Sequence, residues 1–223
     1  MIGFKRLRPH TLSPIGERAK HQMIWAQGRV FIFGGSWRGH ALGDSCEWNP
    51  ADGKCRDLTP SLSSGPAPRY SHQMGAIGDR IFLFGGTDGR SVMNDLWEFD
   101  TSSEQFVNLT ASVPAQLTPR YSHQMVAVRD KAYIFGGRVG DASFRDLFAF
   151  DCRGGSFEDL SGRVPSCLSA RCAHGMAAID GILFIFGGWT GSRPNDFWRF
   201  HPERTAFEDL SRTRRRARQG RAV

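Results

Sequence analysis

The stretch RYSHQMGAIGDRIFLFGG at residues 69–86 is followed by RYSHQMVAVRDKAYIFGG at residues 120–137. The pattern behind these two stretches, an arginine, a histidine three residues later and a closing pair of glycines, occurs four times at a spacing of 51 residues. The arginines are Arg18, Arg69, Arg120 and Arg171, and the glycine pairs begin at Gly34, Gly85, Gly136 and Gly187. A period near 50 residues indicates an array of repeated supersecondary units.

One unit, residues 69–109, contains four short runs of β-forming residues separated by turn signals. SHQMGAIG and IFLFGG are joined by DR, NDLWEFD alternates with Trp97 and Phe99 on one face, and QFVNL follows the turn TSSE. No helical period occurs in the unit, and four-stranded units of this length are typical of propeller blades. The sequence therefore predicts an all-β protein of four blades, at about residues 18–58, 69–109, 120–160 and 171–210.

The chain resembles the kelch-repeat β-propeller family. The resemblance rests on the double glycine after an apolar strand, the Arg-x-x-His upstream of it and the NDLWEFD-type strand downstream, and these marks cover residues 18–210. Kelch units usually carry tryptophan in the outermost strand, whereas this chain has Cys55, Phe106, Phe157 and Phe207 there. The resemblance implies a domain over residues 1–211 that binds a protein partner and has no catalytic activity.

Residues that recur in every unit are expected to serve the architecture. A ring of blades needs one copy of each joint per blade, so we expect the repeated arginine to bond loop carbonyls and the repeated histidine to bond the backbone. The aspartate at the start of each third strand, Asp44, Asp95, Asp146 and Asp196, is interpreted in the same way.

Function is expected where the units differ, in the long loops that should open on one face of the blades. The loops between the second and third strands are residues 36–43, 87–94, 138–145 and 189–195, and the linkers between blades open on the same face. Arginine and tryptophan are favoured at interfaces, and arginine forks onto carboxylates and phosphates. We therefore predict a site for a protein partner, or an acidic or phosphorylated peptide, formed by Trp37, Arg38, Arg90, Arg138, Phe144, Arg145, Trp189 and Arg193.

An enzymatic role is not expected. Some kelch-like propellers are copper oxidases with tyrosine and histidine ligands, but this chain has only three tyrosines, and Tyr70 and Tyr121 are repeat positions. The sequence has no glycine-rich phosphate loop, nucleophile elbow or His-Glu metal motif. We expect no metal and no cofactor.

The basic charge lies at the two ends of the chain. The net charge is +7, yet residues 1–10 carry three basic residues and residues 212–223 carry six arginines without an acid, so the part between is slightly acidic. We expect residues 212–223 to be a disordered tail. The tail supports an alternative function, a ribonucleoprotein component that contacts RNA phosphates through Arg214, Arg215, Arg216 and Arg218.

The cysteine content and the N-terminal sequence favour an intracellular protein. The five cysteines include no Cys-x-x-Cys pair, and residues 1–10 lack the apolar run of a secretory signal. No segment has the length of apolar sequence that a membrane crossing needs, so no membrane partner is expected. We expect Cys46 and Cys55 to be directly opposed on adjacent strands of the first blade, as a thiol pair rather than a disulfide.

The arrangement of outermost strands predicts that the chain does not stand alone as a closed ring. The pattern Phe-x-x-Leu lies 14 residues before a repeated arginine at Phe106, at Phe157 and at Phe4, so residues 4–7 should form an extra outermost strand. Five outermost strands for four sets of the other three leave one surplus. We expect the terminal blades to pack on a partner or a second copy, the alternative being that residues 4–7 displace the C-terminal strand and close a compact monomer.

Overall fold

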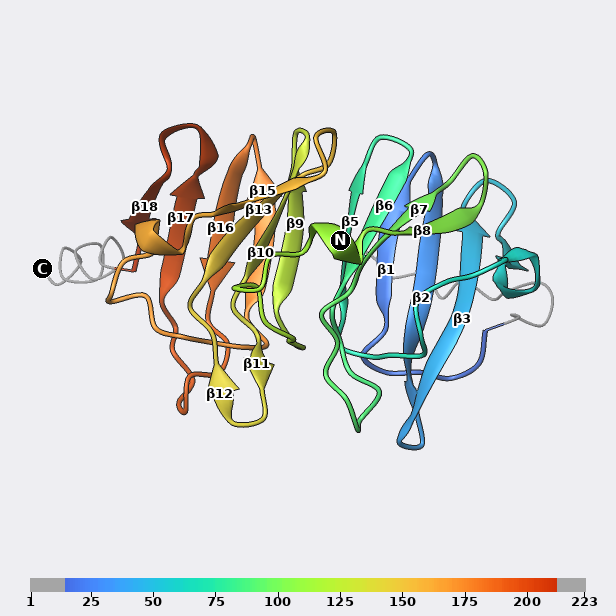
Figure 1. Cartoon of the computed structure of the whole chain (residues 1–223), viewed down its shortest axis with the longest axis horizontal. Helices are drawn as coiled ribbons and strands as arrows, with labels where there is room; N and C mark the ends of the chain where they lie inside the picture. Colours follow the sequence, from blue (N-terminus) through green and yellow to red (C-terminus); the bar gives the residue numbers. More distant parts are fainter. Residues whose placement is uncertain (1–14, 212–223) are drawn as a thin grey trace, which may run out of the picture.

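The computed structural model describes residues 15–211 and is built almost entirely of β-strands. Four antiparallel sheets of four strands follow one another along the chain (Figure 1). Blade 1 contains β1 to β4, blade 2 contains β5 to β8, blade 3 contains β9, β10, β13 and β14, and blade 4 contains β15 to β18. The prediction of four four-stranded blades is confirmed, whereas the predicted strand at residues 4–7 and the tail at 212–223 lie outside the described residues.

The strand bounds show the repetition. The strands of blades 1 and 2 are Gln22–Ala26, Arg29–Trp37, His40–Asn49, Lys54–Asp57, Gln73–Ile77, Arg80–Phe84, Leu96–Asp100 and Gln105–Asn108. Those of blades 3 and 4 are Gln124–Val128, Lys131–Phe135, Leu147–Asp151, Ser156–Asp159, Gly175–Ile179, Ile182–Phe186, Phe197–His201 and Ala206–Asp209. Blade 3 also carries a small hairpin of β11, Arg138–Val139, and β12, Ala142–Ser143.

Tight two-residue turns join the first and second strands of the blades. In blade 1 the turn residues Gln27 and Gly28 both have positive φ, as do Asp180 and Gly181 in blade 4. Two-residue turns of this kind match the right-handed twist of the strands they join. The resulting register pairs Ala26 with Arg29 and continues to Gln22 opposite Phe33.

The second strands of blades 2 to 4 end at the double glycines because backbone from the next blade or the same blade lies against them. Gly136 has a φ of +64°, and a Cβ there would lie 2.6 Å from the carbonyl oxygen of Arg171 in the following blade. Both observations require glycine. Blade 1 differs, since β2 continues past a bulge between Phe33 and Gly35 and forms a long hairpin with β3.

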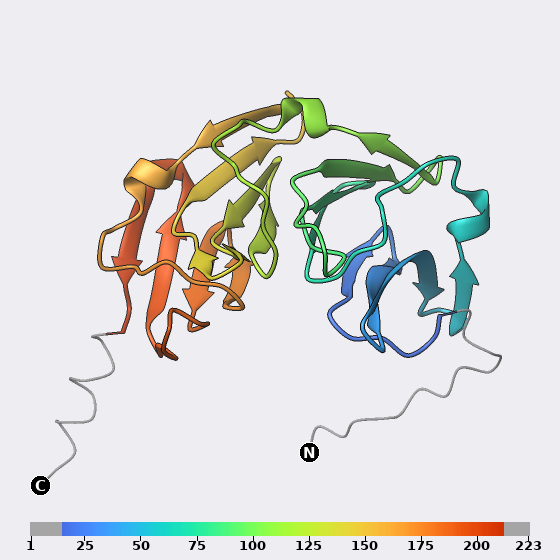
Figure 2. The same ribbon diagram turned by 60° about the horizontal axis from the view of Figure 1, so that its bottom comes forward.

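The hydrophobic core lies between blades. One cluster joins blades 1 and 2, a second joins blades 2 and 3, and a third joins blades 3 and 4. The four blades follow an arc with blades 1 and 4 at its two ends (Figure 2). Within residues 15–211, no helix has the length and the apolar composition needed to cross a bilayer.

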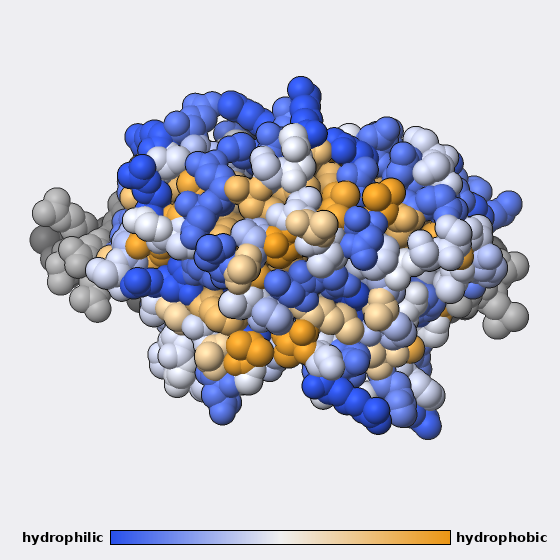
Figure 3. Space-filling model, in the orientation of Figure 1, coloured by the Kyte–Doolittle hydropathy of each residue, from blue (hydrophilic) through white to orange (hydrophobic). Residues whose placement is uncertain are grey.

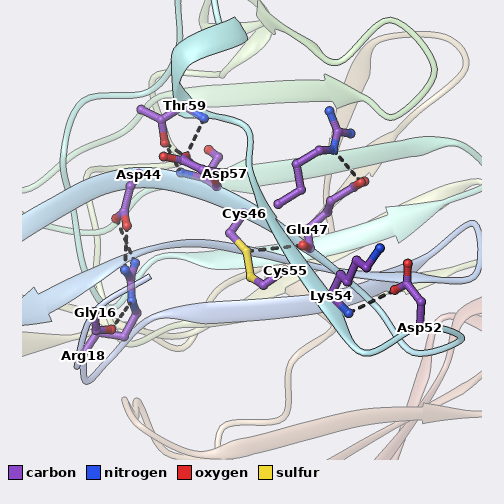
Figure 4. Close-up of a disulfide and its surroundings, with 12 residues drawn as sticks. Gly16, Arg18, Asp44, Cys46, Glu47, Asp52, Lys54, Cys55, Asp57 and Thr59 are labelled. Carbon is purple, nitrogen blue, oxygen red and sulfur yellow. Dashed lines mark hydrogen bonds and ion pairs between the residues drawn. A yellow bond between two sulfur atoms is a disulfide. The ribbon is translucent and has the colours of Figure 1, made fainter. Parts of the chain in front are cut away.

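The cysteine pair of blade 1 confirms the predicted proximity across β3 and β4 and corrects two details, the direct opposition and the free thiols. Cys46 lies opposite Asp57 and Cys55 opposite Trp48, so the cysteines are diagonal rather than directly opposed neighbours on β3 and β4. They share one face of the sheet, with 6.7 Å between their Cα atoms, and are joined by a disulfide instead of standing as two thiols (Figure 4). This separation falls within the range that a disulfide spans.

Candidate functional site

The repeated arginine ties three parts of each blade together. The Arg120 guanidinium donates to both carboxylate oxygens of Asp146, at 2.6 and 2.7 Å, and to the carbonyl oxygen of Gly136 at 3.0 Å. Its Nε donates to the carbonyl oxygen of Thr118 at 3.0 Å. The other three arginines bind their aspartates in the same forked way, and Figure 4 shows this for Arg18 and Asp44. The predicted structural role of these arginines and aspartates is confirmed.

The ion pairs lower the pKa of two of the aspartates, Asp95 and Asp196. Burial alone would raise the pKa of Asp95, but hydrogen bonds from Arg69 and its positive charge outweigh this effect and hold the pKa below its usual value. The same balance lowers the pKa of Asp196 beside Arg171. The indole N–H groups of Trp97 and Trp198 also donate to these aspartates, a contact that the alternating strand pattern did not predict.

The repeated histidines behave differently from the expectation. His72, His123 and His174, here called the joint histidines, are buried, and neither ring nitrogen of any of them has a hydrogen-bond partner within residues 15–211. Instead, each ring packs edge-on against a phenylalanine of the preceding blade, with centroids 5.3 to 5.4 Å apart. The prediction that they bond the backbone is wrong, because the rings fill apolar space between blades.

The environment of the joint histidines keeps them neutral. Burial, followed by the charge of the nearby repeated arginine, lowers the pKa of His72 and of His174 to about 3. The same causes hold the pKa of His123 well below its usual value. A neutral, buried imidazole between blades is a packing element, so we assign these residues to the architecture.

The predicted partner-binding residues lie in loops that share one side of the molecule. The connections between the second and third strands of all four blades emerge at the lower side of Figure 1. In space-filling view the tips of this lower side are hydrophilic, with apolar residues just above them (Figure 3). Two of the four segments are hairpins rather than open loops, because residues 36–43 continue β2 and β3, and residues 138–145 contain β11 and β12.

The two terminal blades each present a tryptophan stacked with an arginine. The Arg38 guanidinium lies 4.3 Å from the ring centroid of Trp37, and that of Arg193 lies 5.7 Å from the ring of Trp189. Both tryptophans are 41% exposed, so the loops do not simply fold them onto the blades. The Trp37 indole donates to Glu17 at 3.3 Å, which the sequence pattern did not predict.

The loops of blades 2 and 3 contribute the other predicted residues. Arg90 is exposed in a loop closed by the Asp88 carboxylate, which accepts the backbone N–H groups of Arg90 and Ser91, and these bonds lower the Asp88 pKa. Arg138 donates to the carbonyl oxygen of Gly140, and Arg145 donates to that of Ser166 at 3.1 Å.

Phe144 is half-buried, and its ring lies against the repeated arginine of its own blade. Its ring centroid lies 4.4 Å from the Arg120 guanidinium. Two repeat residues that were not predicted for the site lie beside the loops: Tyr70 under the ammonium of Lys20, at 4.9 Å, and Tyr121 near Arg138, at 5.8 Å. Their shared Arg-Tyr-Ser-His context in blades 2 and 3 was the available signal.

Four loop arginines have no carboxylate partner within residues 15–211: Arg38, Arg90, Arg145 and Arg193. By contrast, six arginines elsewhere on the blades each form an ion pair: Arg29, Arg56, Arg80, Arg129, Arg153 and Arg199. The guanidinium groups of these four arginines are therefore not held in ion pairs by the described part of the chain, although Asp88 lies in the same loop as Arg90. The arginines predicted to contact nucleic acid, Arg214, Arg215, Arg216 and Arg218, lie outside the described residues.

No group of three or more histidine, cysteine, aspartate or glutamate side chains within residues 15–211 is arranged to hold a metal ion. The free cysteines of this part are Cys152 and Cys172, which are buried, and Cys167, which is exposed.

Comparison with known proteins agrees with this geometry. The family model described as the KLHDC2/KLHL20/DRC7 Kelch-repeats domain matches residues 20–223. Tip elongation aberrant protein 1 of Schizosaccharomyces pombe is 31% identical over 82% of this chain, and the leucine-zipper-like transcriptional regulator 1 homolog of Drosophila melanogaster is 27% identical over 87%. The chain covers only 17% and 21% of these two relatives.

An enzyme also occurs among the relatives. The N-(sulfonatooxy)prop-2-enimidothioate sulfolyase of Thlaspi arvense is 33% identical over 55% of this chain, which covers 36% of it. The relatives are thus diverse in role, although kelch-repeat domains typically bind proteins. The chain has four kelch-type blades with an arginine–aspartate ion pair in each, and the family model matches residues 20–223. It therefore belongs to the KLHDC2/KLHL20/DRC7-type kelch-repeat family.

Proposed function

We propose that this chain is a non-catalytic protein-binding kelch domain that receives an acidic or phosphorylated segment of a partner on its loop side. The observation that carries the proposal is the set of four loop arginines without a carboxylate partner, one in each blade. A guanidinium is planar and binds carboxylate or phosphate with two parallel hydrogen bonds. Four such groups on one side of a rigid frame favour an elongated anionic ligand.

The tryptophans add a second element of recognition. Trp37 and Trp189 expose part of their rings at the two ends of the loop side and hold Arg38 and Arg193 by stacking. Arg38 and Gly39 both have positive φ and form the two-residue turn at the tip of the β2–β3 hairpin. Partly exposed aromatic and arginine side chains are the types that contribute most to binding at protein interfaces.

The test is a peptide array of acidic, phosphorylated and uncharged sequences, followed by fluorescence anisotropy on the peptides that bind. Replacing Arg38, Arg90, Arg145 or Arg193 with alanine should weaken binding by about tenfold each, which corresponds to ~1.4 kcal/mol. Arg204 is the matched control, because it is exposed in the turn between β17 and β18 on the opposite side and forms no ion pair with the residues that the structure describes. Arg204→Ala should bind as the parent does.

Two results would refute the proposal. One is a preference for uncharged peptides, and the other is an affinity that the four loop substitutions leave unchanged.

A further inference from the structure

The three contacts between neighbouring blades are built from the same backbone hydrogen bonds. The second glycine of each pair donates to the carbonyl of the next repeated arginine, at 2.8 to 2.9 Å for Gly35, Gly86 and Gly137. The N–H of that arginine donates back to the preceding blade, as Arg120 does to Met93 at 3.2 Å. A third bond runs between the inner segments, from Ser122 to Ser71 at 2.9 Å and from Ala173 to Ser122 at 2.8 Å. We call this set of contacts a blade joint.

The two ends of the arc carry the two halves of a fourth blade joint. On blade 4, the N–H of Gly188 and the carbonyls of Ala173 and Pro194 have no hydrogen-bond partner within residues 15–211. On blade 1, the same is true of the N–H and carbonyl of Arg18 and of the N–H of Lys20. Each unpaired donor on one end corresponds to an unpaired acceptor on the other.

The exposure of side chains also shows that the outer face of blade 4 lacks a neighbouring blade. Phe186 is 53% exposed, whereas Phe33, Phe84 and Phe135, which occupy its position in the other blades, are at most 3% exposed. In the three existing joints this phenylalanine packs against the histidine of the next blade. Blade 4 has no following blade within the described residues, and the only repeated histidine without a phenylalanine of this kind is His21 of blade 1.

Blade 1 has the complementary surface. Met23 is 62% exposed, while Met74 and Met125 at the same position are 6% and 3% exposed, each packed against the preceding blade. Trp25, 58% exposed, stands where the other blades have alanine, Ala127 among them.

The contacts of an existing joint identify the residues that would meet at a fourth joint. In the joint between blades 2 and 3, a Cβ on Gly75 would contact Met125 and Ala127. At a fourth joint the corresponding neighbours are Ala177 on blade 4 and Met23 with Trp25 on blade 1. Two residues before Ala177, on the same face of β15, Gly175 replaces the glutamine that the other three blades carry, so this face of blade 4 has no side chain at that position.

We propose that the open face of blade 4 binds the open face of blade 1 in a second copy of this chain, forming the fourth blade joint twice and closing a ring of eight blades. The two faces lie at opposite ends of the arc, so one chain does not bring its own halves together in this structure (Figure 2). Both halves are present in every chain, and a head-to-tail contact of this type closes into a ring when the rotation permits. Eight blades is within the range known for propellers.

The test is the molar mass of the pure chain of 223 residues, measured by size-exclusion chromatography with light scattering. The parent protein should have twice the chain mass of 24.9 kDa. Phe186→Asp and Trp25→Asp should each shift the mass to that of a monomer, because each change damages both joints of the ring. Val107→Asp is the matched control, since Val107 is 50% exposed on the outermost strand of blade 2, away from both end faces, and should leave the dimer intact.

Mixing the two variants distinguishes a head-to-tail joint from a contact between identical faces. Phe186→Asp retains a normal blade 1 face and Trp25→Asp a normal blade 4 face, so an equal mixture should recover a dimer through one intact joint. Circular dichroism and thermal melting verify that each variant is folded. A monomeric parent protein, a mass above the dimer, or a mixture that stays monomeric would overturn the proposal.

Discussion

Arg120 offers a sharp test of how the blades are held together. Its side chain is fully buried, and it satisfies the Asp146 carboxylate, which is 20% exposed, as well as the carbonyls of Thr118 and Gly136. Arg120→Met keeps an unbranched side chain but leaves a partly buried carboxylate and two carbonyls without their donors. Removing one partner of a buried ion pair costs about 3–5 kcal/mol, and we expect a loss of free energy of unfolding in this range.

The assay is urea denaturation followed by tryptophan fluorescence and circular dichroism. Lys131→Met is the matched control, because Lys131 and Glu158 form an ion pair 2.9 Å long in the same blade, with exposed fractions of 41% and 51%. An exposed pair contributes about 0–1 kcal/mol, so this variant should be nearly as stable as the parent. Arg120→Lys should give an intermediate loss, since an ammonium cannot make the forked contact.

The double variant Arg120→Met with Asp146→Asn separates the cost of an unpaired charge from the loss of packing. Neutralising the carboxylate should recover part of the stability lost in Arg120→Met. The reasoning would be refuted if Arg120→Met lowered the free energy of unfolding no more than Lys131→Met does. It would also be refuted if adding Asp146→Asn recovered none of the free energy of unfolding lost in Arg120→Met.

Four further predictions follow from buried and terminal groups. The joint histidines have a pKa near 6.5 in the unfolded chain and a much lower pKa in the folded protein. Their full contribution to the free energy of unfolding should therefore be present above pH 6.5. It should fall by about 1.4 kcal/mol per pH unit per histidine as the pH drops from there toward 3, and replacing one histidine with glutamine should reduce the slope of a pH series of melts. Gly136→Ala should destabilise more than Gly155→Ala, because both have positive φ but only Gly136 would place a Cβ against backbone; equal melting temperatures would contradict this. Burial raises the pKa of Cys152 to about 12, so a thiol reagent at pH 8 should label exposed Cys167 and spare Cys152, as mass spectrometry can show. If the basic tail contacts RNA, deleting residues 212–223 should abolish salt-dependent RNA binding in a filter assay, and unchanged binding would exclude the tail.

Much of the architecture could be predicted from local sequence. The period of 51 residues and the turn signals determined the number of blades and their strands, because strand alternation and glycine-containing turns act over a few residues. The structural role of Arg120 and Asp146 was also predictable, since a residue present in every blade serves what every blade shares. The alternation of strands likewise placed the loops of Arg38 and Arg193 on one side.

Only the tertiary structure revealed the contacts that a residue makes with an adjacent strand or an adjacent blade. The joint histidines were expected to form hydrogen bonds, but the phenylalanine that packs against each ring comes from another repeat, and no local pattern reveals it. Cys46 and Cys55 were expected to be directly opposed, whereas the register of β3 and β4 makes them diagonal and joins them. The count of outermost strands predicted that the terminal blades need a partner. Phe186 and Met23 match their repeat partners in sequence, however, and only the arc identifies them as exposed residues, because burial depends on the presence of an adjacent blade.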